Sequence, residues 1–254
     1  MRQCRGMRRA LDAVLLAAVV VVVGAAVVDA TTTSSDDAVE TAVDALRTEH
    51  IRGRLVVAAP DCSRRELDLP SLRERRLGVL ACSVYGRPGS LAVYRGGIVW
   101  YAFAGGTTTL LRGRDLDAYL GRHARIVRVA WLGNVRYAAT YRLAGRADET
   151  LALFERGTLV RVLGRAPAYD DVRSSPSGRL LAVRAGGRLT LYDALGERVR
   201  LPREAEDALA LAWSPDERWA VAVGPDTLAV FRTRSDRVVA RVPLGGVDVD
   251  WPSP

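Results

Sequence analysis

The chain has 254 residues, of which 49% are hydrophobic and 26% are charged, so it can bury a sizeable core and does not have the composition of a disordered protein. All 37 basic residues are arginine, and against 29 acidic residues they give a net charge of +8. The arginines are scattered and often alternate with apolar residues, as in residues 125–129, which is typical of strands with one solvated face. This pattern excludes nucleic acid as an expected partner.

The first 30 residues have the layout of a membrane-targeting segment. Four arginines among the first nine residues precede the uncharged run Ala13–Val28. A helix over this run and the two residues before it would span roughly 27 Å, close to the thickness of the hydrocarbon core. Because the arginines lie only on the N-terminal side, we expect a cytoplasmic tail over residues 1–10 and a transmembrane signal anchor over residues 11–29. Cleavage after the anchor, with release of the protein, is the alternative.

Beyond the anchor, residues 30–50 are expected to form a stalk or linker, and residues 51–254 the folded domain on the extracellular or periplasmic side. A short helix is predicted within the stalk, from about Ser35 to Arg47. Its apolar face would consist of Val39, Val43 and Leu46.

The sequence contains three cysteines. Cys62 and Cys82 both fall on the predicted outer side of the membrane, where disulfides persist, and we expect them to pair. Cys4 lies in the predicted cytoplasmic tail, and its role stays open. Two cysteines and the distant His50 and His123 have no metal-ligand spacing, so no metal and no cofactor is predicted.

The folded domain contains an internal repeat. Residues 175–183 match residues 214–222 at an offset of 39 residues, which is the length expected of a propeller blade with four strands. Glycine pairs and Pro-Asp between the apolar stretches are hairpin-turn residues. The second to fifth blades would occupy residues 78–113, 125–167, 170–201 and 209–243, with a helical insertion at residues 114–124.

The two ends of the domain complement each other. Residues 55–77 match the last three strands of a blade, and no first strand precedes them. Val247–Trp251 matches a first strand, and no further strands follow it. We therefore expect an all-β fold, a five-bladed β-propeller closed by pairing of the N- and C-terminal strands, which removes the open sheet edges.

Two segments carry a recognisable signature, Trp213–Arg218 (WSPDER) and Ser174–Arg179 (SSPSGR). They resemble the Ser-Pro-Asp-Gly-Arg/Lys pattern of the WD40-like, or PD40, β-propeller repeats found in the C-terminal domain of the bacterial protein TolB. Good matches cover about residues 169–254. This resemblance implies a bacterial propeller, while the first three blades depend on their strand pattern alone.

No local catalytic motif is present: the sequence contains no G-x-S-x-G, H-E-x-x-H, P-loop or G-x-G-x-x-G, and neither histidine is placed for a triad. No catalytic residue is therefore predicted. Four aspartates lie at or just before a predicted first strand, the innermost strand of a blade. These candidate ligand contacts at the channel mouth are Asp170, Asp171, Asp207 and Asp248.

The favoured interpretation is a membrane-tethered, non-enzymatic propeller that binds a protein or a cell-envelope component. The alternative is an anchored or secreted carbohydrate-active hydrolase that uses two of the channel aspartates as paired acids. Trp131, Trp213 and Trp251 recur at strand ends, so they are expected to pack between blades rather than to form a sugar platform. The sequence does not indicate the oligomeric state.

Overall fold

The computed structural model of the chain describes residues 35–79, 91–94, 97–101, 107–120, 123–133 and 135–253. The predicted tail (1–10), the predicted anchor (11–29), Cys4 and Cys82 lie outside these residues. None of the helices within the described ranges is long and apolar enough to cross a membrane. All described strands belong to one compact unit that begins at Val39.

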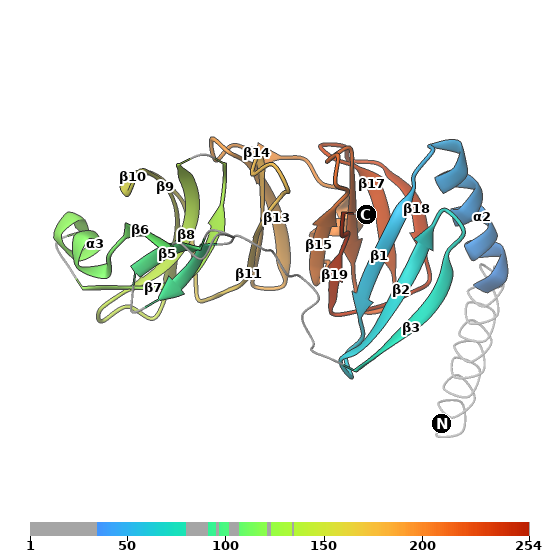
Figure 1. The fold of residues 1–254 in the computed structure, drawn as a ribbon, viewed down its shortest axis with the longest axis horizontal. Helices are drawn as coiled ribbons and strands as arrows, with labels where there is room; N and C mark the ends of the chain where they lie inside the picture. The colour runs from blue at the N-terminus through green and yellow to red at the C-terminus, as the bar shows by residue number, and fades with distance from the viewer. Residues whose placement is uncertain are drawn as a thin grey trace, which may run out of the picture. The chain divides into compact units, whose positions relative to one another are not determined.

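The strands form five small antiparallel sheets, which we name A to E (Figure 1). Sheet A has the order β19 (Asp248–Asp250), β1 (Gly53–Ala58), β2 (Ser63–Leu69) and β3 (Arg73–Val79). Sheet B contains β4 (Leu91–Tyr94), β5 (Gly97–Tyr101) and β6 (Thr107–Leu111). Sheet C contains β7 (Ala124–Trp131), β8 (Arg136–Leu143), β9 (Glu149–Glu155) and β10 (Thr158–Ala166). Sheet D contains β11 (Tyr169–Ser174), β12 (Leu180–Ala185), β13 (Arg188–Asp193) and β14 (Arg198–Val199). Sheet E contains β15 (Ala210–Trp213), β16 (Trp219–Val223), β17 (Leu228–Arg232) and β18 (Val238–Val242).

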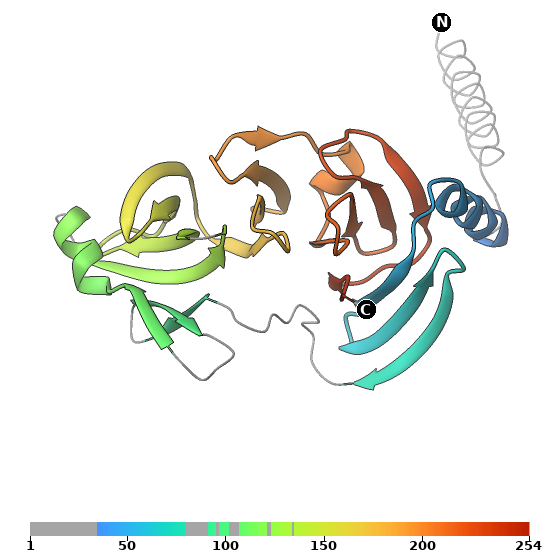
Figure 2. The same cartoon turned by 45° about the horizontal axis from the view of Figure 1, so that its top comes forward.

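The C-terminal strand completes the first sheet, as predicted. β19 pairs antiparallel with β1, with Val57 opposite Val249 and Ala58 opposite Asp248. Figure 2 shows β19 beside β1, although the two strands lie at opposite ends of the domain sequence. The predicted second blade begins too early, however, because Gly78 and Val79 belong to β3 of sheet A.

Buried clusters connect the sheets in chain order. One cluster joins sheets B and C, a second joins C and D, a third joins D and E, and a fourth joins E and A. Successive side chains of a strand point to opposite faces. On β12, Leu180 therefore packs toward sheet E and Leu181 toward sheet C. No fifth cluster between sheets A and B occurs among the described residues, so the blade count and the closed ring stay predictions.

The predicted repeat signature has a clear local structure. In each copy the serine hydroxyl oxygen accepts a hydrogen bond from the backbone N–H of the residue five positions later. The distance is 3.1 Å from Leu180 N to Ser175 Oγ and 3.0 Å from Trp219 N to Ser214 Oγ. Gly178 adopts φ +73°, and a Cβ there would lie 2.3 Å from the backbone nitrogen of Gly133. The glycine thus lets the turns of sheets C and D touch.

Equivalent turns are also linked further along the chain. The hydroxyl of Ser177, in the β11–β12 turn, lies 2.7 Å from a carboxylate oxygen of Glu217 in the β15–β16 turn. The backbone N–H of Ser177 donates to the same carboxylate. The repeat signature therefore connects sheets D and E as well as shaping each hairpin.

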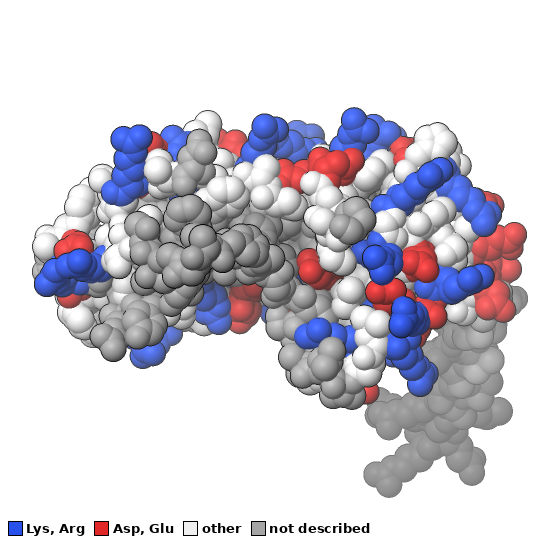
Figure 3. Space-filling model, viewed as in Figure 1, with Lys and Arg blue, Asp and Glu red and all other residues white. Residues whose placement is uncertain are grey.

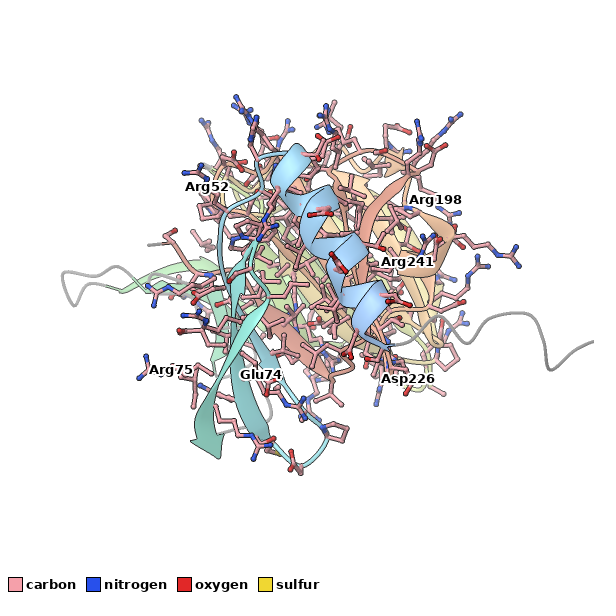
Figure 4. All side chains as sticks on the ribbon, turned by 90° about the vertical axis from the view of Figure 1, so that its right-hand side faces the viewer. Arg52, Glu74, Arg75, Arg198, Asp226 and Arg241 are labelled. Atoms are coloured by element: carbon pink, nitrogen blue, oxygen red, sulfur yellow. The ribbon has the colours of Figure 1, made fainter. Side chains whose placement is uncertain are left out.

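Three helices accompany the sheets: α2 (Ser35–Thr48), α3 (Gly113–Leu120) and α4 (Arg203–Glu206). The helix expected within residues 30–50 is present as α2, and the helical insertion after the second blade is present as α3. Ala42 and Leu46 of α2 are buried in the cluster that joins sheets E and A. Figure 4 shows α2 crossing in front of these strands. The apolar face of this helix is thus part of the domain core.

Candidate functional site

The guanidinium of Arg173 joins two of the four predicted aspartates. Its Nη2 lies 2.6 Å from Oδ1 of Asp248, and its Nε contacts Oδ2 of Asp171. Its Nη1 donates to the carbonyl oxygen of Val249 at 3.2 Å. We refer to these three charged residues as the Asp171–Arg173–Asp248 cluster.

The cluster is assembled from strands that are far apart in sequence. Asp171 and Arg173 lie two residues apart on β11, so both project from the same face of that strand. Asp248 begins β19, which reaches this place by pairing with β1. Sheets D and A both pack against sheet E, and Arg173 spans from β11 to β19. The pairing of β19 with β1 therefore brings the carboxylate of Asp248 to the same guanidinium as that of Asp171.

The three side chains are largely removed from solvent. The side chains of Asp248 and Arg173 are only 5% and 9% exposed, whereas that of Asp171 is 28% exposed. Such burial is costly for each ionised group, and one guanidinium balances the charge of only one carboxylate. The cluster therefore carries a net charge of about −1 with both aspartates ionised, and it becomes neutral when one proton binds.

Asp171 binds a proton more readily than an ordinary aspartate does. Burial raises the pKa of Asp171 above its ordinary value, and the negative charge of Asp248 adds to this effect, while Arg173 opposes it. Because Asp171 is also the most exposed member of the cluster, it can exchange its proton with solvent or with a bound molecule. The geometry thus places a carboxyl group with a raised pKa beside a carboxylate that pairs with Arg173.

The other two predicted aspartates are not brought to this cluster. Asp170 is 45% exposed and lies 3.5 Å from Nη1 of Arg184 within sheet D. Asp207 is exposed and follows the last residue of α4. A register shift between Tyr169 and Asp171 in the pairing of β11 with β12 separates the neighbours Asp170 and Asp171.

Sequence reasoning missed two buried charged residues. Arg173 was not predicted, although an arginine two positions after an aspartate on an innermost strand is a usable signal. Glu149 on β9 was missed as well. Its side chain is 3% exposed, lies 2.9 Å from Nη2 of Arg142 and accepts the N–H of Tyr169 at 3.4 Å. Glu149 lies directly opposite Arg142 in the β8–β9 pairing, so these two side chains form a cross-strand ion pair.

The remaining candidate groups do not form a second centre. His123 lies at the surface with its Nδ1 2.7 Å from Oδ2 of Asp117, and His50 is exposed after α2. Over the described ranges, no three His, Cys, Asp or Glu side chains gather as a metal site would require. Cys62 is disulfide-bonded. Its predicted partner Cys82 lies outside the described residues, so this pairing stays a prediction.

No protein-family model matches the chain, and no curated protein matches its sequence. One similar solved structure is regucalcin, a calcium-binding protein from Agrobacterium tumefaciens, with 14% identity, a TM-score of 0.37, and coverage of 71% of this chain and 66% of the other. Another is an oligogalacturonate lyase in complex with manganese, with 12% identity, a TM-score of 0.35, and coverage of 64% and 50%. The fold is propeller-like.

This likeness concerns the fold alone. The chain spans about two thirds and one half of the lengths of these two proteins, and the identities are low. Neither protein is described as WD40-like, so the resemblance to that particular repeat family stays a prediction. The activities and ligands named for the two proteins remain theirs.

The prediction that the chain is not an enzyme is wrong. It depended on the absence of a local catalytic motif, but one of the solved proteins with a similar arrangement of sheets is a lyase. Residues of an active site can come from separate sheets, so a contiguous motif is not required. The fold therefore gives no reason to exclude catalysis, and the function has to be argued from the site.

Proposed function

We propose that the protein is a carbohydrate-active hydrolase whose active site is the Asp171–Arg173–Asp248 cluster. The observation that carries this proposal is the sharing of one buried guanidinium by two carboxyl groups from different sheets. Pairs of carboxyl groups whose environments favour different protonation states are the usual equipment for cleaving a glycosidic bond.

Each member of the cluster has a distinct role. Asp171 holds the proton and donates it to the leaving-group oxygen while the bond between that oxygen and the anomeric carbon breaks. The negative charge of Asp248 stabilises the positive charge that develops on the sugar ring. Water then supplies hydroxide to the anomeric carbon, and its remaining proton returns to Asp171, so the enzyme is regenerated. Arg173 keeps both carboxyl groups in position.

The cellular setting is part of the proposal. We infer that residues 11–29 anchor the chain in the cell membrane and that residues 51–254 form a five-bladed ring of WD40-like repeats on its outer side. The arginines before the apolar run, the β1–β19 pairing and the disulfide at Cys62 support this setting. The substrate is then a polysaccharide of the cell envelope.

Two of the four aspartates contact Arg173 and two do not, and this difference provides the experiment. Asp171→Asn and Asp248→Asn are each expected to lower turnover by about 10²–10⁴-fold, the usual contribution of an acid or base group. Asp170→Asn and Asp207→Asn are matched controls, because these residues lie close in sequence or in the predicted pattern but outside the cluster. The assay follows new reducing ends released from purified bacterial cell-wall polysaccharides by the full chain in detergent micelles.

Two outcomes would contradict the proposal. One is the absence of turnover by the unsubstituted protein on every polysaccharide of the panel. The other is an equal loss in the Asp170 or Asp207 variants, which would place the chemistry elsewhere. Thermal unfolding of all four variants separates lost chemistry from lost structure.

A further inference from the structure

A cavity of about 580 Å³ lies between the C-terminal end of α2 and the hairpin that joins β17 to β18. Figures 1 and 2 both show α2 beside β18. The volume of this cavity is within the range of small-molecule sites. None of its lining residues belongs to the Asp171–Arg173–Asp248 cluster, so it is separate from the proposed active site.

The helix and the hairpin line this cavity from the same side of sheet E. Ala45 and Glu49 lie one helical turn apart, and the N–H of Glu49 donates to the carbonyl oxygen of Ala45 at 3.1 Å. On the hairpin, Arg232 lies opposite Trp219 in the β16–β17 pairing, so these two side chains project from one face. Trp219, Val239 and Ala45 all pack against the core cluster that joins sheets E and A. The lining residues of the two elements therefore face one another.

The cavity contains one unpaired positive charge. Glu49 and Arg232 form an ion pair between the helix and the hairpin at 2.7 Å. Arg237 also lines the cavity and is exposed, and it lies two residues before Val239, so it projects to the same side. Within the described part of the chain, no carboxylate lies at ion-pair distance from its guanidinium. Two arginines and one glutamate give the cavity a net charge of +1.

Such an unpaired arginine differs from its surroundings. Basic and acidic side chains are interspersed over the face shown in Figure 3. Because the guanidinium of Arg237 lies beside an open cavity rather than beside an acidic side chain, it is available to an anionic ligand.

The cavity also offers an apolar surface and a hydroxyl group. Ala45 and Val239 are only partly buried, so a ligand can contact them. The hydroxyl oxygen of Ser235 accepts the backbone N–H of Arg237 at 3.1 Å. The hydroxyl hydrogen has no acceptor among the described residues and can be donated to a ligand.

We propose that this cavity binds a small monocarboxylate with an apolar body. The carboxylate is held by Arg237 and the hydroxyl of Ser235, and the apolar body lies against Ala45 and Val239. A guanidinium presents two parallel N–H donors that match the two oxygens of a carboxylate. One negative charge also balances the net charge of the cavity. This binding site is additional to the proposed hydrolase site.

The test is an NMR titration of the nitrogen-15-labelled full chain in detergent micelles with benzoate, and with benzamide as the uncharged molecule of similar shape. We expect benzoate to shift the backbone N–H signals of Ser235, Arg237 and Val239 until they saturate, and benzamide to bind at least about tenfold more weakly. Arg237→Gln should weaken benzoate binding about tenfold, because it removes a charge-assisted contact. Arg234→Gln removes the same charge from the same hairpin without lining the cavity, and should leave the affinity unchanged.

Three results would overturn this proposal: no saturating shift of these signals with benzoate, equally tight binding of benzamide, or an equal loss in the Arg234 variant, which would indicate diffuse attraction. The rest of the NMR spectrum shows whether each variant is folded. Because both arginines are exposed and neither belongs to a core cluster, we expect both variants to fold.

Discussion

Arg173→Met is expected to lower the free energy of unfolding by about 3–5 kcal/mol, because it leaves the buried carboxylate of Asp248 without its positive partner. The side chain of Asp248 is 5% exposed, so water cannot replace the lost contact. The variant also loses the hydrogen bond from Nη1 to the carbonyl oxygen of Val249, which connects β11 to β19. Denaturant unfolding of the full chain measures the difference.

Arg184→Met is the matched control for this experiment. Arg184 lies on the same sheet, and its 3.5 Å contact is with Asp170, which is 45% exposed. A pair of this kind contributes about 0–1 kcal/mol. Equal losses in the two variants would mean that the position of Arg173 between the two aspartates has no special importance.

Trp251→Ala should cost about 3–5 kcal/mol, the usual loss for truncating a buried tryptophan. Trp251 is 4% exposed and packs in the cluster that joins sheets E and A. Its indole lies directly against Gly53, where a Cβ would come within 2.6 Å of Nε1. The tryptophan therefore holds the end of β19 against β1, and its loss should also reduce hydrolysis by displacing Asp248.

Trp219→Ala provides the comparison. Trp219 is only partly buried beside the same cluster, with the guanidinium of Arg232 5.2 Å from its ring centre. Its truncation should cost clearly less than that of Trp251. A loss below about 1 kcal/mol in the Trp251 variant, measured by the same unfolding curves, would show that the C-terminal strand is not needed to hold sheet A together.

Much of the strand order was predictable because the signals for it are local. The serine, proline and glycine residues of the repeat signature determine their own turns, as the hydrogen bonds from Leu180 and Trp219 to the turn serines show. The pairing of β19 with β1 was also predictable, because the first blade lacked its first strand and the C-terminal residues supplied a strand of that type without a blade of its own. Trp213 and Trp251 are buried between sheets, as expected from their positions at strand ends.

The site was only half predictable. Asp170 and Asp171 are adjacent in the sequence, and the alternation of side chains along β11 places Asp171, and not Asp170, on the same face as Arg173. The partner of that arginine comes from another sheet, so no spacing in the sequence reveals it. The same reason explains the wrong prediction about catalysis, since a search for local motifs cannot find groups that meet through folding.

Asp171 and Asp248 share one guanidinium, and burial, together with the negative charge of Asp248, raises the pKa of Asp171 above its ordinary value although Arg173 opposes this shift. This linkage also affects stability. Since the pKa of Asp171 is raised on folding, its stabilising contribution is complete below the pKa of the unfolded chain and is lost as the pH rises through the folded value. The Asp171→Asn variant should lack this part of the pH dependence.

The most direct test is a carbon-13 NMR titration of the Asp171 carboxyl group in the full chain, with and without Asp248→Asn. We expect a raised pKa in the unsubstituted protein and a lower pKa in the variant, because the neighbouring negative charge is gone and Arg173 is left to Asp171. An ordinary pKa for Asp171 that does not change when Asp248 is neutralised would contradict the account.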